Sequence, residues 1–265
     1  MSARRDVSSA KNPAIQRFRA VAAGEVPDLM LAEGVRLVGE AVAAGVEVVE
    51  AAVSPRCGDE SLRHELQSRA RTFLDCSDDV LARLSALDTP QGVAVLLRRP
   101  AVTEQQLLRG PGAPLVVVAA GVRDPGNLGS LLRAAEAAGA SGCLTMRGGA
   151  DPFRDKAVRG SMGSIFRLPV RHGFDAAGVI AFGKAHRLQL VVADGGRGDR
   201  AHTAVDLRQP LLLVVGAEAA GVPDELVEAA AACVRIPLRG QVESLNVAVA
   251  AGVLLFEAQR QRGGV

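Results

Sequence analysis

Five polar residues between positions 127 and 246 of this 265-residue chain stand shortly after apolar runs, where parallel strands of a sheet usually carry their functional loops. They are Asn127, Arg133, Glu218, Ser244 and Asn246. A guanidinium can hold a phosphate, a carboxylate can fix a hydrogen-bond network, and amide and hydroxyl groups can orient both. If the strands before them are adjacent, we expect these side chains to converge at one edge of the sheet.

The first segment, DPGNLGSLLRAAEAAG, occupies residues 124–139 directly after the apolar run LVVVAAG. Its Pro-Gly pair forms a tight turn, and Asn127 can cap the helix that follows. Arg133 projects from this helix about two turns in, and Gly129 lets another backbone come close. The alternative is a plain turn with an N-cap and a solvated arginine. The glycines lack the GxGxxG spacing of a dinucleotide-binding fingerprint.

The second segment, residues 211–230, places a carboxylate at the mouth of an apolar strand. Glu218 stands between Gly216 and Gly221, and glycines allow a ligand to approach the backbone. The alternative is a strand-to-helix turn in which Glu218 accepts hydrogen bonds from neighbouring amides.

The third segment, CVRIPLRGQVESLNVAVAAGVLLFEA, spans residues 233–258 and runs from a short strand through a polar loop into a helix. Ser244 and Asn246 open this helix, which continues to about Arg262. Its alanines and glycine allow close packing, either on its own sheet or on a second copy of the chain. A plain N-cap is the alternative role of Ser244.

From Leu115 onward, apolar strands alternate with helices, which predicts an α/β fold with a parallel sheet covered on both faces. The expected strands are residues 115–121, 143–146, 166–170, 188–194, 211–218 and 233–238.

The expected organisation is a large domain preceded by smaller parts. Residues 29–99 read as a small α/β unit, and the Pro- and Gly-containing residues 100–114 as a linker to the domain 115–265. Residues 1–28 form a basic arm, with five basic residues and one acid within residues 1–23, an arrangement that often tracks phosphates. An ordinary solubilising terminus is the alternative.

The amino-acid composition limits which partners and cofactors the protein is expected to bind. The net charge is only +2, so a nucleic-acid contact has to be local, and the absence of Trp and Tyr argues against a surface of stacked aromatics. The four cysteines lack metal-ligand spacing, so no metal is expected. No signal-peptide core or membrane-length apolar run is present, which predicts a cytoplasmic protein. The stretch GRGDR, residues 196–200, is interpreted as a charged loop.

Taken together, the three segments resemble the signature motifs of the SpoU (TrmH-like) family of RNA ribose 2′-O-methyltransferases, in the SPOUT superfamily. The resemblance covers about residues 115–262, and more loosely residues 29–99, through AEGVRLVGEA. The matching residues are Asn127, Gly129, Arg133, Gly216, Glu218, Gly221, Ile236, Pro237, Ser244, Leu245 and Asn246.

The resemblance implies a deep trefoil knot in the C-terminal domain, an RNA substrate-binding N-terminal domain, and a homodimer whose active site takes residues from both chains. It also implies S-adenosyl-L-methionine as cofactor. The residues expected to bind it are Val215, Gly216, Ala217, Gly221, Ile236, Leu238, Ser244 and Leu245.

The family assigns a central role to Arg133 at this site. As a general base it would have to lose a proton, which guanidinium groups strongly resist, so we favour a role in holding the target phosphate and activating the hydroxyl; direct base catalysis stays open. Asn127, Ser244 and Asn246 would orient the ribose and the arginine, and Glu218 would fix the network or approach the sulfonium.

A structured RNA is the expected substrate, 23S ribosomal RNA rather than transfer RNA, because a separate N-terminal domain precedes the catalytic one. The alternatives are a transfer-RNA 2′-O-methyltransferase and a non-catalytic RNA-binding factor with the same fold. Methylation of a base nitrogen, as in a sister family, is disfavoured by the SLN segment at residues 244–246.

Overall fold

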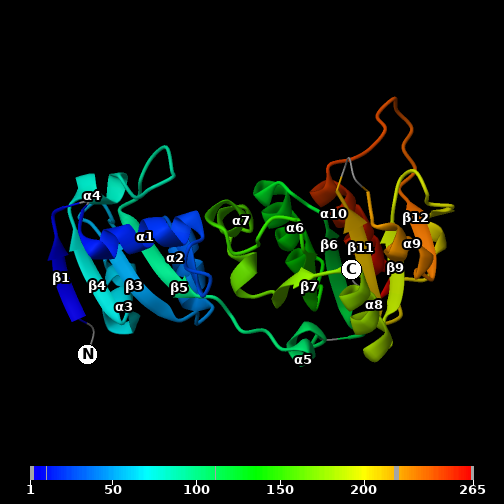
Figure 1. The fold of residues 1–265 in the computed structure, drawn as a ribbon, viewed down its shortest axis with the longest axis horizontal. Helices are drawn as coiled ribbons and strands as arrows, with labels where there is room; N and C mark the ends of the chain where they lie inside the picture. The colour runs from blue at the N-terminus through cyan, green and yellow to red at the C-terminus, as the bar shows by residue number, and fades with distance from the viewer. Residues whose placement is uncertain (1–2, 10, 111, 218–220, 264–265) are drawn as a thin grey trace. The chain divides into compact units, whose positions relative to one another are not determined.

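The computed structural model describes residues 3–9, 11–110, 112–217 and 221–263. The chain forms two compact units, each with its own sheet and hydrophobic core (Figure 1). Unit 1 comprises residues 1–101 and 153–166, and unit 2 comprises residues 102–152 and 167–265.

Unit 1 is built on a five-stranded sheet in the order β1-β4-β3-β5-β2, in which only β5 runs against its neighbours. Its strands are β1 Ala3–Val7, β2 Leu29–Glu33, β3 Val48–Val53, β4 Thr72–Cys76 and β5 Val93–Arg98. Its helices are α1 Pro13–Ala23, α2 Val35–Ala43, α3 Glu60–Arg69, α4 Asp78–Ala82 and α7 Asp155–Gly160, with the 3-10 turn η1 Ser164–Phe166.

The N-terminal residues are part of unit 1 rather than a free arm. β1 pairs with β4 at the sheet edge, and α1 buries Ile15 and Phe18 in the core. Arg17 Nη1 donates a hydrogen bond to Glu50 Oε1 at 2.6 Å. The prediction of a basic arm over residues 1–28, separate from the domain 29–99, is therefore wrong for the described residues, because α1 has a buried apolar face that charge counting does not reveal.

Unit 2 is built on a seven-stranded parallel sheet in the order β10-β12-β9-β11-β6-β7-β8. Its strands are β6 Leu115–Ala120, β7 Gly142–Met146, β8 Val170–Phe174, β9 Gln189–Ala193, β10 Arg200–Ala201, β11 Leu211–Gly216 and β12 Ala232–Arg235. Its helices are α5 Glu104–Leu107, α6 Pro125–Ala137, α8 Ala176–Ala185, α9 Asp224–Glu228 and α10 Val247–Gln261, with the 3-10 turn η2 His202–Ala204. β6 and β7 are buried along their whole length, which confirms the expected parallel α/β sheet.

The strand order places a topological switch point between β6 and β11. From β6 the chain continues to β7 and β8 on one side, whereas β11, β9 and β12 lie on the other. In open parallel sheets, ligands bind outside the carboxyl ends of the strands at such a point. The loop after β6 leads into the first segment singled out in the sequence, and the residues after β11 belong to the second, so both lie where a ligand is expected.

One expected strand is displaced. The pattern predicted a strand over residues 166–170, but β8 begins at Val170 and runs to Phe174. Pro169 has no N–H to donate to a sheet, so the strand starts after it. The Pro169 carbonyl oxygen accepts a hydrogen bond from Cys143 N at 2.9 Å, which starts the pairing of β8 with β7.

Residues 153–166 belong to unit 1, although the sequence placed them in a domain running from 115 to 265. Val158 is buried, and Arg159 Nη1 lies 3.1 Å from Glu33 Oε1. The Glu33 side chain is only 4% exposed, and a buried carboxylate needs such a partner. Because the two partners stand far apart in the chain, sequence patterns could not reveal this contact.

The second part of the expected linker also belongs to a folded unit. Leu107 of α5 is completely buried and joins the core of unit 2. It packs so closely on Gly142 that a Cβ there would lie 2.6 Å from the Leu107 side chain. The linker predicted over residues 100–114 therefore does not stay outside the fold.

Candidate active site

The helix α6 begins directly after β6, at the carboxyl edge of the unit 2 sheet. Its N-cap is Asp124, whose Oδ1 accepts a hydrogen bond from Asn127 N at 2.8 Å, and Pro125 fills the first helical position. The prediction that Asn127 caps this helix is wrong, because the aspartate three residues earlier takes that place. The Asn127 side chain is left available for another contact.

That contact joins the first segment to the third. Asn127 Oδ1 accepts a hydrogen bond from Asn246 Nδ2 at 2.9 Å. Asn246 is the N-cap of α10, and its Oδ1 accepts a hydrogen bond from Ala248 N at 3.0 Å. Asn246 rather than Ser244 therefore caps α10. The two helices also pack on each other, so the structure brings these two segments together as expected.

Arg133 lies farther along α6 and is exposed. Within the part of the chain that the structure describes, no hydrogen bond or ion pair engages its guanidinium. Glu218, the carboxylate singled out in the second segment, lies outside the described residues.

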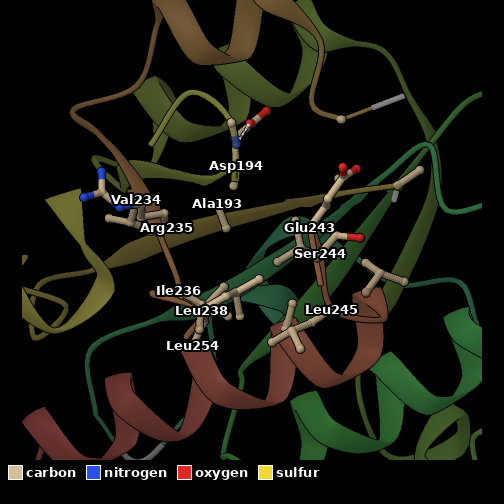
Figure 2. Close-up of a pocket in the computed structure, with 18 residues that line it drawn as sticks. Ala193, Asp194, Val234, Arg235, Ile236, Leu238, Glu243, Ser244, Leu245 and Leu254 are labelled. Carbon is tan, nitrogen blue, oxygen red and sulfur yellow. Dashed lines mark hydrogen bonds between the residues drawn. The ribbon is translucent and has the colours of Figure 1, made fainter. Parts of the chain in front are cut away.

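A cavity of about 320 Å³ opens at the ends of β9, β11 and β12, beside the loop 236–246 and α10 (Figure 2). The eight residues expected to bind a cofactor all line it: Val215, Gly216, Ala217, Gly221, Ile236, Leu238, Ser244 and Leu245. Figure 2 shows Ile236, Leu238 and Leu254 together on one side of the cavity, with Asp194 and Glu243 on the other. The cavity thus has an apolar side and a polar side.

Glycines shape the cavity wall. A Cβ on Gly216 would lie 2.5 Å from the carbonyl carbon and oxygen of Gly221, and a Cβ on Gly198 would lie 2.6 Å from the carbonyl carbon of Val234. Neither position can accept a side chain without moving backbone. Gly195, by contrast, faces open space within the lining. The wall is tightly packed at Gly216 and Gly198, whereas the space beside Gly195 is open, so a ligand can reach the backbone there.

The loop after β9, which contributes Asp194, Gly195 and Gly196 to the lining, was not predicted from the sequence as part of the site. Asp194 Oδ1 accepts hydrogen bonds from the backbone N–H groups of Gly196 and Arg197, each at 3.0 Å. Burial raises the pKa of the Asp194 carboxyl, but the side-chain and backbone hydrogen bonds of Arg197 outweigh it, and the pKa lies below its ordinary value. The available signal was a carboxylate after an apolar strand and before glycines, the pattern that drew attention to Glu218.

This arrangement can bind an organic molecule of cofactor size that has both apolar and polar parts. Among the residues that the structure describes, no group of three or more His, Cys, Asp and Glu side chains is placed to hold a metal ion. None of the described helices is long and apolar enough to cross a membrane.

Comparison with known proteins adds two domain matches. The family model described as SpoU rRNA Methylase family matches residues 114–256, and that of the MRM3-like substrate binding domain matches residues 25–95.

Proteins that resemble the whole chain include a curated relative and two solved structures. The 23S rRNA (guanosine(2553)-2′-O)-methyltransferase RlmP of Bacillus subtilis is 31% identical over 266 residues, covering 95% of this chain and 98% of RlmP. An AdoMet-bound rRNA methyltransferase from Sinorhizobium meliloti has a TM-score of 0.86 and 31% identity, with 97% and 98% of the two chains covered. The SpoU methyltransferase AviRb from Streptomyces viridochromogenes, in complex with AdoMet, has a TM-score of 0.86 and 30% identity, with 95% and 98% covered.

Fold and site define an α/β protein with a ligand cavity at the carboxyl ends of β9, β11 and β12 of a parallel sheet, together with a separate small α/β unit. The chain belongs to the SpoU rRNA methylase family.

Proposed function

We propose that this protein transfers a methyl group from S-adenosyl-L-methionine to a ribose 2′-hydroxyl of 23S ribosomal RNA. The observation that carries the proposal is the Asn127–Asn246 hydrogen bond, which joins two of the three family segments beside a cavity lined by the second and third. RlmP, similar over almost its whole length, is named for this reaction on 23S rRNA, which favours ribosomal over transfer RNA.

The cavity suits the proposed cofactor. Its volume of about 320 Å³ is within the usual range for small-molecule sites, and its lining combines apolar side chains with glycine backbone. Open space at Gly195 leaves room on the polar side, whereas the apolar side is closed by Ile236 and Leu254. When bound, S-adenosyl-L-methionine supplies an electrophilic methyl group on a sulfonium.

The chain's own residues would position the ribose and assist loss of its proton. Arg133, exposed and without a described partner, would hold the target phosphate and stabilise the negative charge that develops on the 2′-oxygen. The linked amides of Asn127 and Asn246 fix the starts of α6 and α10, and Ser244 at the cavity would orient the ribose. Correct placement of the two reactants supplies much of the rate gain. We include Glu218 as the residue that completes this network.

The test is incubation of the purified protein with radiolabelled S-adenosyl-L-methionine and separate pools of unmodified ribosomal and transfer RNA. A 2′-O-methyl group blocks alkaline cleavage of the next phosphodiester, so label in alkali-stable dinucleotides from 23S rRNA is the expected result. Label in transfer RNA would shift the substrate assignment. Cofactor and RNA binding without transfer to either pool would instead identify a non-catalytic RNA-binding factor.

We also propose that the active form is a homodimer joined through α10. Val249, Val253 and Phe256 follow one another at helical spacing, and they are 53%, 37% and 49% exposed. The opposite side of this helix buries Leu254 and Leu255 in the unit. An exposed apolar stripe of this kind is typical of a protein contact. A cytoplasmic location and the trefoil knot stay predictions.

The proposed homodimer predicts that a substitution in the α10 contact lowers the mass of the protein in solution. Phe256→Glu places a charge within the proposed contact, and we expect light scattering after size exclusion to show a monomer where the unchanged protein is a dimer. Arg109→Glu, which changes an exposed charge two residues beyond the end of α5, should leave the mass unaffected. A monomeric unchanged protein, or a dimer that survives Phe256→Glu, would remove α10 as the contact.

Two further arginines near the site are expected to bind RNA phosphates. Arg123 precedes the N-cap of α6 and Arg239 follows the cavity residue Leu238; both are exposed and, among the described residues, have no side-chain partner. Replacing either by alanine should make the slope of log affinity against log salt shallower by about 1. Filter binding across a salt series measures this slope, with Arg109→Ala as the matched control. Unchanged slopes would place the RNA elsewhere.

A further inference from the structure

The charged loop 196–200 contains an arginine that binds two of the segments around the cavity. Arg197 Nε and Nη2 donate hydrogen bonds to Asp194 Oδ2 at 3.0 and 2.6 Å. The same guanidinium donates from Nη2 to the Val222 carbonyl oxygen at 2.5 Å and from Nη1 to Asp224 Oδ1 at 2.6 Å. One side chain therefore connects the loop after β9 with the segment that leads into α9.

Asp194 lines the cavity, yet its carboxylate has no acceptor capacity left for a ligand. Oδ1 accepts two backbone N–H groups, from Gly196 and Arg197, and Oδ2 accepts two donors of the Arg197 side chain. A carboxylate offers about four lone-pair positions, so the protein itself uses all of them. Its side chain is 11% exposed, and the paired guanidinium balances its charge. Asp194 is thus suited to hold the loop and not to bind a ribose or an amine directly.

The pair also fixes Gly221, which lines the cavity on the side of β11. Gly221 has a φ of +62°, and a Cβ on it would lie 3.3 Å from Asp194 Oδ2 and 3.5 Å from Arg197 Nη2. Its N–H donates to the carbonyl oxygen of Ala217, the residue after β11, at 2.9 Å. The position of this wall therefore depends on the ion pair packed against it.

We infer that Arg197 is a positioning residue for the cofactor: it holds the loop after β9 and the cavity residue Gly221 in the arrangement that binds S-adenosyl-L-methionine. The inference rests on the proposed function. Arg197 itself is absent from the cavity lining, so it acts through Asp194 and Gly221. Its removal weakens cofactor binding while leaving the methyl-transfer step, which the residues of α6 and α10 support, intact.

The chain offers a matched control for loss of an arginine–aspartate pair. Arg208 Nε donates to Asp206 Oδ1 at 2.9 Å and Nη2 to Oδ2 at 3.1 Å, and neither residue lines the cavity. Arg197→Ala and Arg208→Ala therefore remove the same chemistry at two places. Arg197→Lys keeps the charge but cannot reach three partners with one planar group, so it should recover only part of the binding.

The experiment measures S-adenosyl-L-methionine binding by calorimetry, together with kcat and cofactor KM on 23S rRNA, for the unchanged protein and these variants. Arg197→Ala should raise Kd and KM about tenfold or more, since several charge-assisted hydrogen bonds are lost. Its kcat at saturating cofactor should stay within about twofold, the signature of lost binding rather than lost catalysis. Arg208→Ala should change neither constant.

Asp194→Asn tests the same ion pair from its other partner. It replaces the Oδ2 acceptor by an amide that faces the guanidinium donors, so it should also raise the Kd for S-adenosyl-L-methionine. In the double variant Arg197→Ala/Asp194→Asn, the loss of binding free energy should be smaller than the sum of the two single losses. An unchanged Kd in Arg197→Ala, a lower thermal stability without a change in Kd, or a fall confined to kcat would each overturn the inference. If the unchanged protein binds no S-adenosyl-L-methionine, the proposed function itself fails.

Discussion

Replacing Arg133 by alanine is expected to slow methyl transfer by about 100- to 1,000-fold, the loss typical when one group that stabilises developing charge is removed. Arg133 is exposed on α6 and does not line the cavity, so the Kd for S-adenosyl-L-methionine should stay unchanged. Arg133→Lys keeps the positive charge but loses the planar fork that matches a phosphate, and an intermediate rate is expected. Single-turnover transfer to 23S rRNA measures the chemical step.

Arg109→Ala controls for the loss of an exposed arginine in the same unit. Arg109 also has no described side-chain partner, but it precedes β6, whereas α6 follows the carboxyl end of that strand. Its removal should leave the rate as it is. Transfer at the unchanged rate in Arg133→Ala would show that Arg133 has no part in the reaction, and weaker cofactor binding in that variant would assign it to the cavity instead.

The location of the site could be predicted from the sequence because it depends on local patterns. Apolar strands followed by glycines and polar residues mark the carboxyl ends of a parallel sheet, and the structure places the predicted cofactor residues around one cavity there. Asn127 and Asn246 could be expected to meet for the same reason. The details of capping could not, because Asp124, Asn127, Ser244 and Asn246 are all good cap residues and only the backbone decides between them.

What the sequence could not provide are contacts between distant positions. The loop after β9 acquires its role from Arg197 reaching Val222, and residues 153–166 join unit 1 through the Arg159–Glu33 pair. The sequence indicated only a charged loop at residues 196–200, and it placed residues 153–166 within the domain 115–265. In each case the charged side chains hold two segments together, and their partners are chosen by tertiary packing rather than by spacing along the chain.

A methyl group on Gly216 is expected to abolish most cofactor binding. A Cβ there would lie 2.5 Å from the carbonyl carbon and oxygen of Gly221, and both are backbone atoms that cannot rotate away. The bridge between Ala217 and Gly221 would have to open, at a cost of about 1–3 kcal/mol for such overpacking. Because Gly216, Ala217 and Gly221 all line the cavity, the strain moves its wall.

Gly240→Ala separates this clash from the general effect of replacing a glycine near the site. Gly240 lies in the loop between β12 and α10, and a Cβ on it meets no atom within 4 Å. Calorimetry should therefore show a Kd for S-adenosyl-L-methionine raised more than about tenfold in Gly216→Ala, the equivalent of 1.4 kcal/mol, and an unaltered one in Gly240→Ala. Equal affinities in the two variants would mean that the backbone at Gly216 and Gly221 can shift without disturbing the ligand, and the cofactor would then have to bind away from this wall.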